Sequence, residues 1–207
     1  MKIIGLTGGI ATGKSTVSKM LVERGYEVID ADVVARELQV KGSPLLSELV
    51  SVFGSTILAE DGNLIRGKLG SIIFTDDKAR SKVDDIFRPA IRAEFERRIA
   101  QSQQEILFLD VPLLFEAGFD ELTTENLVIS LSYQKQLERL MNRNDLTKFE
   151  AEARINAQMP MVEKVVRADY VIDNDGNLQD LLKQVEKFLG GMTHERNAHG
   201  KSTIIKD

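Results

Sequence analysis

Residues 1–17 read MKIIGLTGGIATGKSTV and contain the strongest structural signal in the chain. Within this stretch, the run GGIATGKS from Gly8 to Ser15 matches G-x-x-x-x-G-K-[ST], the pattern of a phosphate-binding loop. The apolar segment 2–7 before the loop is typical of a buried strand, and the residues after it have helical spacing up to Gly25. Because a phosphate loop joins a strand to a helix, the motif stands in the context that it requires.

Each residue type in this loop has a chemical role toward a nucleoside triphosphate. Glycines let the backbone turn its N–H groups toward phosphate, and the following helix adds the positive end of its dipole. Lys14 supplies a point charge, and Ser15 offers a hydroxyl to Mg²⁺. The alternative is a glycine-rich turn that only joins a strand to a helix. The motif indicates a nucleoside triphosphate and does not identify the phosphate acceptor.

Four further segments are predicted strands, and two of them, 105–112 and 126–132, have the near-continuous apolar character of strands buried on both faces of a parallel sheet. Helical patterns separate them, so the sequence predicts an α/β fold of the P-loop NTPase type, a doubly wound parallel sheet of about five strands. In such a sheet the functional groups gather at the carboxyl ends of the strands. The four segments are YEVIDAD (26–32), EILFLDVP (105–112), NLVISLS (126–132) and DYVIDND (169–175).

Two helical excursions interrupt this core. Residues 33–104 contain no convincing core strand and are too long for a plain crossover, so we expect a helical insertion that receives the acceptor. Residues 133–166 are helical and rich in arginine, and we expect them to form a lid. By composition, roughly the last fifteen residues are expected to be disordered. The domain 1–190 then has a core of residues 1–32, 105–132 and 167–190, followed by a polar tail, 191–207.

Composition narrows the possible chemistry. The net charge of −5, from 32 acidic and 27 basic residues, argues against a nucleic-acid partner. The chain has no cysteine, and both histidines, His194 and His199, lie in the tail, so proton transfer must use a carboxylate, a lysine or water. The N-terminal apolar run is too short for a signal or a membrane span. We therefore expect a cytoplasmic protein without a membrane partner, as a monomer or a small homo-oligomer.

Carboxylates follow two of the predicted strands. Asp32 can take the proton from an attacking hydroxyl, or it can cap the helix that begins there. Asp110 ends the segment LFLD in the manner of a Walker-B strand and can hold Mg²⁺ directly or through water, with Glu116 a turn or so later. Many strands end in an acidic residue only for capping or solvation. Asp30, Asp110 and water all remain candidates for the metal shell.

Arginines mark the second excursion. Arg139 and Arg143 are four residues apart in a helical pattern and therefore share one face, and Arg154 lies on the next helix. Such a face can simply be solvated. In phosphoryl transfer, a helical pair that carries arginines can also close over the transferred group and expel water.

Taken together, these residues resemble the dephospho-coenzyme A kinase family, from Met1 to about Gly190. Members of that family join a phosphate-loop core to a helical domain for the coenzyme A moiety and to a lid. They transfer the γ-phosphate of ATP to the ribose 3′-hydroxyl of 3′-dephospho-coenzyme A. The resemblance rests on motifs in the family's order and spacing: GLTGGIATGKSTV, VIDADVVAR, VPLLFE, QLERLMNRN, RINAQMP and ADYVIDNDG.

The resemblance implies a role for each matching position. Lys14 is expected to bridge the β- and γ-phosphates of ATP, Asp32 to act as the general base, and Arg139 and Arg143 to act as lid arginines. The expected Mg²⁺ ligands are Ser15 and Asp110. The expected ATP site comprises Gly9, Ala11, Thr12, Gly13, Lys14, Ser15, Thr16, Asn174 and Gly176. The expected site for the partner substrate, 3′-dephospho-coenzyme A, comprises Asp32, Arg88, Pro112, Leu113 and Glu116.

Two positions depart from the family's pattern. The family usually has glycine at Ala11, which is tolerable if the φ angle there is negative. It usually has histidine at Arg88, where the forked guanidinium of arginine either keeps a contact to an anionic substrate or loses it.

Two other functions stay open: a kinase of another small acceptor, such as a nucleoside monophosphate or shikimate, and a nucleotide switch. Against the switch, the sequence contains no N-K-x-D motif for guanine.

Overall fold

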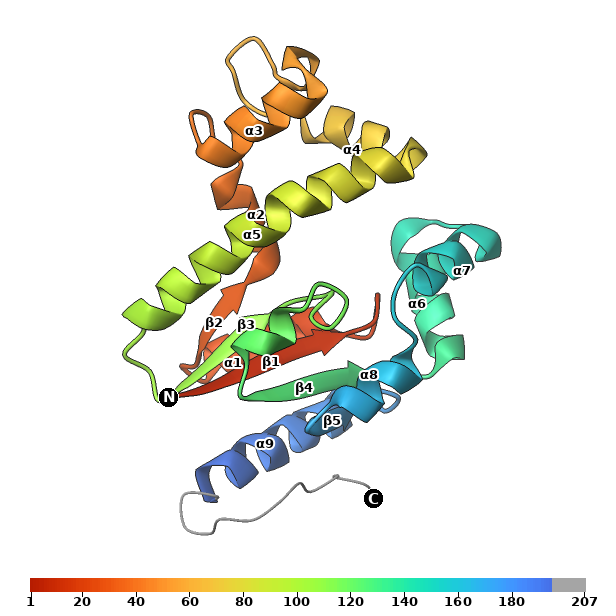
Figure 1. Cartoon of the computed structure of the whole chain (residues 1–207). Helices are drawn as coiled ribbons and strands as arrows, with labels where there is room; N and C mark the ends of the chain where they lie inside the picture. Colours follow the sequence, from red (N-terminus) through yellow and green to blue (C-terminus); the bar gives the residue numbers. More distant parts are fainter. Residues whose placement is uncertain (195–207) are drawn as a thin grey trace. The chain divides into compact units, whose positions relative to one another are not determined.

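Five strands form one sheet in the order β2-β3-β1-β4-β5 (Figure 1). The central strand β1 pairs in parallel with β3 and with β4, and β4 pairs in parallel with β5. All five strands expected from the sequence are present, which confirms the predicted α/β class. The strands are β1 (Lys2–Gly8), β2 (Glu27–Asp30), β3 (Ile106–Asp110), β4 (Glu125–Ser130) and β5 (Tyr170–Asp173).

Alternate side chains of β1 serve two different purposes. Ile4 and Leu6 are fully buried in a core that contains residues of helices α1 (Lys14–Glu23) and α9 (Leu178–His194). Thr7 belongs to the opposite set, because successive side chains of a strand point to opposite faces. Its hydroxyl donates to the Pro112 carbonyl at 3.0 Å. The central strand is thereby fixed from both faces, and its end determines where the phosphate loop begins.

The carboxyl ends of the parallel strands bring together residues that are far apart in the sequence. Gly8, the last residue of β1, is in register with Ile129 of β4, and Ser130 is in register with Asp173 of β5. On the other side, Asp110 of β3 is in register with Leu6. In doubly wound folds, ligands bind at this edge of the sheet.

The chain divides into two compact units, which are Ile29–Ser102 and the remainder, comprising Met1–Val28 and the chain from Gln103 onward. The bounds of the unit Ile29–Ser102 are close to those of the helical insertion expected at 33–104. This unit has its own core, in which Leu49 and Ile57 are fully buried. Its helices are α2 (Ala31–Leu38), α3 (Pro44–Phe53), the 3₁₀ turn η1 (Ser55–Ile57), α4 (Arg66–Thr75) and α5 (Asp77–Gln101).

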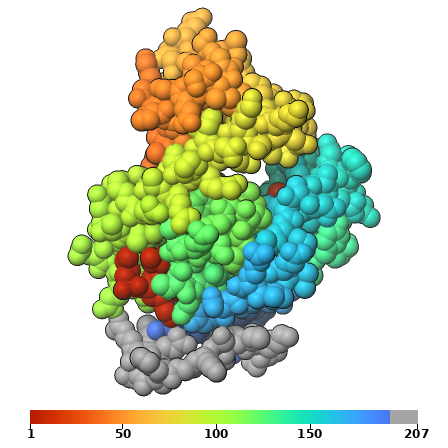
Figure 2. Space-filling model, viewed as in Figure 1, coloured from red at the N-terminus to blue at the C-terminus, as the bar shows by residue number. Residues whose placement is uncertain are grey.

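The segment expected to form a lid is helical and belongs to the same unit as the phosphate loop. A capping box begins its second helix, in which Thr147 and Glu150 satisfy each other's backbone N–H groups. Leu140 and Ala151 are fully buried where the first two helices pack together. On the face seen in Figure 2 this segment forms a continuous surface. The helices are α6 (Tyr133–Asn144), α7 (Lys148–Asn156) and α8 (Met161–Arg167), and the 3₁₀ turn η2 (Phe119–Leu122) precedes them.

This computed structural model describes residues 1–194, with side chains up to Met192. The last helix, α9, ends at His194 and thus extends past the tail boundary expected at 191. The rest of the expected tail and the expected disorder lie outside the described residues. Of the helices in the described part of the chain, none is both long enough and apolar enough to cross a bilayer.

Candidate functional site

The loop between β1 and α1 folds as a phosphate loop. Thr12 stabilises its turn, because the backbone N–H and the hydroxyl of Thr12 both donate to the Gly9 carbonyl, at 3.3 and 2.9 Å. Gly13 caps helix α1 with a φ of 93°, which only glycine adopts easily. Within residues 1–194, several loop N–H groups have no protein acceptor and can bind phosphate. They include those of Ala11, Gly13, Lys14 and Ser15.

The φ angle of Ala11 is positive, whereas the sequence analysis required a negative value for alanine to be tolerated there. Its φ is 63°, in the left-handed region that favours glycine. The left-handed conformation costs a residue with a Cβ atom roughly 1–2 kcal/mol. Ala11 also packs against the core between α6 and α7. The surrounding structure therefore holds this residue in a strained conformation.

Three side-chain amides support the loop, and the sequence reasoning missed two of them. Gln158 accepts a hydrogen bond from the Ile10 N–H at 2.8 Å, and Gln136 donates to the Ile10 carbonyl at 2.8 Å. Asn174, which was expected to shape the adenine pocket, donates to the Thr12 carbonyl at 2.7 Å. The only sequence signal for Gln158 was its place in the motif RINAQMP.

Gly9 leaves room for a side chain that lies against it. A Cβ atom at Gly9 would lie 2.5 Å from the Gln136 side-chain nitrogen, closer than Cβ atoms of folded proteins come to such neighbours, so Gln136 would have to shift. Gly13 is crowded in the same way by the Asn174 amide. The glycines of this loop thus admit the amides that support it, in addition to giving phosphate access to the backbone.

The charges of the site centre on Lys14 and Asp110. The Lys14 ammonium forms an ion pair with the Asp110 carboxylate, which is 1% exposed at the end of β3. Asp110 is thus buried and paired with Lys14, so it is not an acidic residue that only solvates the end of a strand. Ser15 is exposed in the first turn of α1. A hydroxyl and a carboxylate are hard oxygen ligands of the kind that Mg²⁺ takes, so the donor set fits that ion.

The described residues include no cluster of three acidic or histidine side chains that could hold a metal by itself.

Beneath the loop lies a buried lysine that the sequence reasoning missed. Lys164 of α8 is 0% exposed, and its ammonium donates to the Pro112 carbonyl at 3.1 Å and lies 2.9 Å from the Glu116 carboxylate. It also lies 3.4 Å from the Gly8 carbonyl. Glu116 accepts a further bond from the Met159 N–H at 3.0 Å. Pro112 and Glu116, expected to bind substrate, therefore also belong to this internal network.

Of the two lid arginines, the structure brings only one to the loop. Arg139 and Arg143 both lie on α6, as expected. Arg139 donates to the Asn174 carbonyl at 3.2 Å, next to the loop, whereas Arg143 is exposed and bonds to its neighbour Asn144. Arg154, on α7, is also exposed.

The loop after β5 is tied to the start of α6. The Ser132 hydroxyl donates to Asp175 at 2.6 Å, and this bond is the main reason that the pKa of Asp175 lies below its ordinary value. Gly176 follows, and a Cβ atom there would lie 2.9 Å from the Asp180 carboxylate. The segment that carries Asn174 is therefore held in place from α6.

Asp32 and Arg88 belong to the unit Ile29–Ser102. Helix α2 is capped by Asp30, which accepts the N–H groups of Asp32 and Val33 at 2.7 and 3.2 Å. The alternative that Asp32 is the capping residue is therefore wrong, because the side chain of Asp30 already fills that position. Asp32 lies exposed in the first turn of α2, and Arg88 lies exposed on α5.

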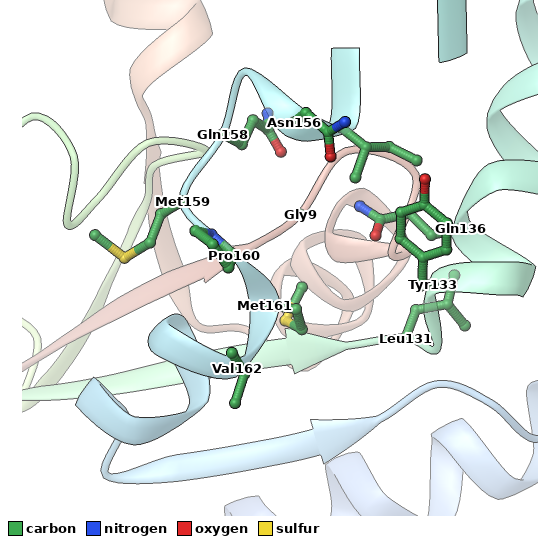
Figure 3. A pocket seen from close by; sticks show the side chains of 11 residues that line it. Gly9, Leu131, Tyr133, Gln136, Asn156, Gln158, Met159, Pro160, Met161 and Val162 are labelled. Atoms are coloured by element: carbon green, nitrogen blue, oxygen red, sulfur yellow. The ribbon is translucent and has the colours of Figure 1, made fainter. Parts of the chain in front are cut away.

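A pocket of about 320 Å³ lies beside the loop, between α6 and the segment that joins α7 to α8 (Figure 3). The side chains of Tyr133, Gln136 and Gln158 line it together with Gly9. Figure 3 shows both glutamine side chains pointing toward the loop near Gly9. The other lining residues are Asn156, Pro160 and the apolar residues Leu131, Ile155, Met159, Met161 and Val162.

The sheet is parallel and has a phosphate loop at the end of its central strand. The site also has a lysine paired with a buried carboxylate, and a neighbouring helical segment carries arginines. These features together define the P-loop kinases. The family model described as Dephospho-CoA kinase matches residues 2–180. The chain belongs to the dephospho-CoA kinase family.

Relatives of known name and solved structures agree with this assignment. A dephospho-CoA kinase of Bacillus cereus is 48% identical over 191 residues, which cover 90% of this chain and 95% of that protein. One of Listeria innocua is 44% identical over 191 residues, or 91% of this chain and 96% of that protein. The solved dephospho-CoA kinase of Campylobacter jejuni matches with a TM-score of 0.73 at 27% identity, over 95% of this chain and 100% of that one.

Proposed function

We propose that this protein transfers the γ-phosphate of ATP to the ribose 3′-hydroxyl of 3′-dephospho-coenzyme A, which yields coenzyme A and ADP. The observation that carries the proposal is a phosphate loop whose Lys14 is paired with a buried Asp110, in a chain of this family. Because the chain has no cysteine, which suits a reducing compartment, we propose the cytoplasm as the location. We also propose that the protein is a monomer or a small homo-oligomer in solution.

The chain's own residues provide a binding surface for a triphosphate. The N–H groups of Ala11 and Gly13 and the first turn of α1 offer donors to phosphate, and Lys14 offers an ammonium group. Ser15 and Asp110 are the proposed ligands of Mg²⁺, which when bound neutralises the charge of the phosphates. Asn174 and Gly176 are proposed to shape the adenine pocket.

The proposed catalysis consists mainly of positioning and charge stabilisation. Phosphoryl transfer passes through a loose transition state, so the protein has to align the two reactants and stabilise the charge on the transferred group. Asp32 is proposed to orient the 3′-hydroxyl and to accept its proton, and Arg139 and Arg143 are proposed to stabilise the transferred phosphoryl group. In support, the Asp32 carboxylate is exposed and is not used as a helix cap.

The acceptor-binding residues also stay proposals. Leu113 is 42% exposed and can contact a substrate directly. Arg88 is exposed on α5 and offers a guanidinium to an anionic group. The carboxylate of Glu116 is already bonded to Lys164 and to Met159, so we propose that Glu116 acts by keeping the shape of the segment that contains Pro112 and Leu113.

The test is ADP formation from Mg·ATP with and without 3′-dephospho-coenzyme A, with the position of the new phosphate located by NMR. We expect ADP release that depends on this acceptor and a product phosphorylated at the 3′-position. Nucleoside monophosphates and shikimate serve as competing acceptors, and preferential phosphorylation of one of them would replace the proposed substrate. Slow ADP release that no acceptor stimulates would point to a nucleotide switch instead.

A further inference from the structure

The backbone of Ile10 is held by two glutamine side chains from distant parts of the chain. The Ile10 N–H donates to the side-chain oxygen of Gln158, and the Ile10 carbonyl accepts from the side-chain nitrogen of Gln136, both at 2.8 Å. A backbone N–H can only donate and a carbonyl can only accept, so these partners fix which way each amide points. Although it lies in the phosphate loop, the Ile10 N–H therefore faces protein.

The two glutamines come from the two ends of one helical hairpin. Gln136 lies in the first turn of α6, and Gln158 lies two residues after the last residue of α7. Helices α6 and α7 pack together around Leu140 and Ala151, both fully buried. The hairpin is thus attached at both of its ends to a single residue of the loop. Figure 3 shows the two glutamine side chains near Gly9, the residue before Ile10. We call this pair of contacts the Ile10 clamp.

The Ile10 clamp lies directly before the strained part of the loop. Ala11 follows Ile10 and has a φ of 63°, a conformation that an alanine leaves when its surroundings permit. Gln136 is 4% exposed, so water cannot readily replace its bond to the Ile10 carbonyl. Fixing both polar groups of Ile10 therefore fixes the direction in which the next N–H groups point.

We propose that Gln136 and Gln158 are positioning residues for the triphosphate. By holding Ile10 they keep Ala11 in its left-handed conformation and aim the N–H groups of Ala11 and of residues 13–15 at the phosphates before the nucleotide arrives. The same contacts set the position of α6, and Arg139 lies one turn after Gln136 on that helix. This inference rests on the proposed function for the identity of the nucleotide. It adds the residues that organise the loop in advance.

The polarity of the Ile10 clamp gives a sharp test. Gln136→Glu and Gln158→Glu each place one carboxylate against Ile10. The added negative charge should therefore repel the phosphates of ATP to a similar extent in both variants. Only Gln158→Glu keeps a hydrogen-bond partner, because a carboxylate accepts from the Ile10 N–H. Gln136→Glu sets a carboxylate against a carbonyl, and both are acceptors. Gln134→Glu, exposed on the same helix, controls for the added charge.

The measurements are the Kd of Mg·ATP by calorimetry, KM for ATP, kcat, and Tm without nucleotide. We expect Gln136→Glu to bind Mg·ATP about tenfold more weakly than Gln158→Glu, since an unsatisfied buried acceptor is costly. We expect Gln134→Glu to bind within about twofold of the parent, as suits an exposed surface charge. Lowering the pH should narrow the gap, because a protonated carboxyl at position 136 can donate to the Ile10 carbonyl.

Equal Kd values for the two variants, with only Tm changed, would overturn the proposal and leave the glutamines a structural role. If Gln136→Glu does not fold, Gln136→Met and Gln158→Met each remove one partner of Ile10 without adding charge, both should weaken Mg·ATP binding, and a Kd unchanged in both would overturn the proposal equally. Because Kd is measured without an acceptor, a parent that binds ATP but does not phosphorylate 3′-dephospho-coenzyme A would refute the proposed function alone.

Discussion

Replacing Lys164 by methionine should destabilise the protein by about 3 kcal/mol. The ammonium of Lys164 is fully buried and bonds to the Pro112 carbonyl and to the Glu116 carboxylate. Methionine retains most of the aliphatic volume and removes the charge, so Glu116 loses its buried partner. Breaking such a pair costs about 3–5 kcal/mol, and the lower end applies because the Glu116 side chain is 22% exposed.

Urea unfolding followed by circular dichroism measures this change directly. In a chain of this length each kcal/mol shifts Tm by about 2–4 °C, so Tm should fall by about 6–12 °C. Lys183→Met is the matched control, because the Lys183 side chain is 78% exposed and its loss should cost about 0.5 kcal/mol or less. Combining Lys164→Met with Glu116→Gln removes the unpaired charge, so the double variant should lose at least about 1 kcal/mol less than the sum of the two single losses.

Two results would refute this reasoning. A stability of Lys164→Met within about 1 kcal/mol of the parent would mean that the buried ammonium contributes little. Strict additivity in the double variant would mean that Lys164 and Glu116 do not interact energetically, despite the 2.9 Å between their charged atoms.

Three further outcomes are expected. Ala11→Gly and Ala157→Gly each remove a methyl group, but of the two positions only Ala11 has a positive φ. In urea unfolding, Ala11→Gly should therefore be more stable than Ala157→Gly by about 1–2 kcal/mol. Equal stabilities of the two variants would contradict the strain at Ala11. Hydrogen bonds, chiefly from Arg97, lower the pKa of Glu94 to about 2 from 4.5, so its stabilising effect is complete above pH 4.5 and is lost as the pH falls toward 2. Glu94→Gln should therefore lower stability by about 1 kcal/mol at pH 7, with a difference from the parent that shrinks between those pH values, and a constant difference would argue against the pairing. Asp32→Asn should lower kcat by about 10²–10⁴ and leave Mg·ATP binding nearly intact; unchanged kcat would remove Asp32 from the mechanism.

Much of the fold could be predicted because its signals are local. The phosphate-loop motif occupies eight consecutive residues from Gly8 to Ser15, and each strand is a short apolar run that needs no distant partner to be recognised. Helix α5 was predictable for the same reason, since its capping residue Asp76 stands directly before the helical pattern. At Asp30 and Asp32, however, two acidic residues compete for one cap, and only the backbone geometry shows that Asp30 fills it.

The class of fold and the phosphate loop could be read from the amino-acid sequence alone, because both follow from neighbouring residues. Only the tertiary structure decided that Gln136 and Gln158, 126 and 148 positions away from Ile10, hold its backbone, and that Lys164 is buried beneath the loop. It also decided the sign of φ at Ala11. These features depend on contacts between segments far apart in the chain, and no local pattern of residues specifies which polar groups will meet there.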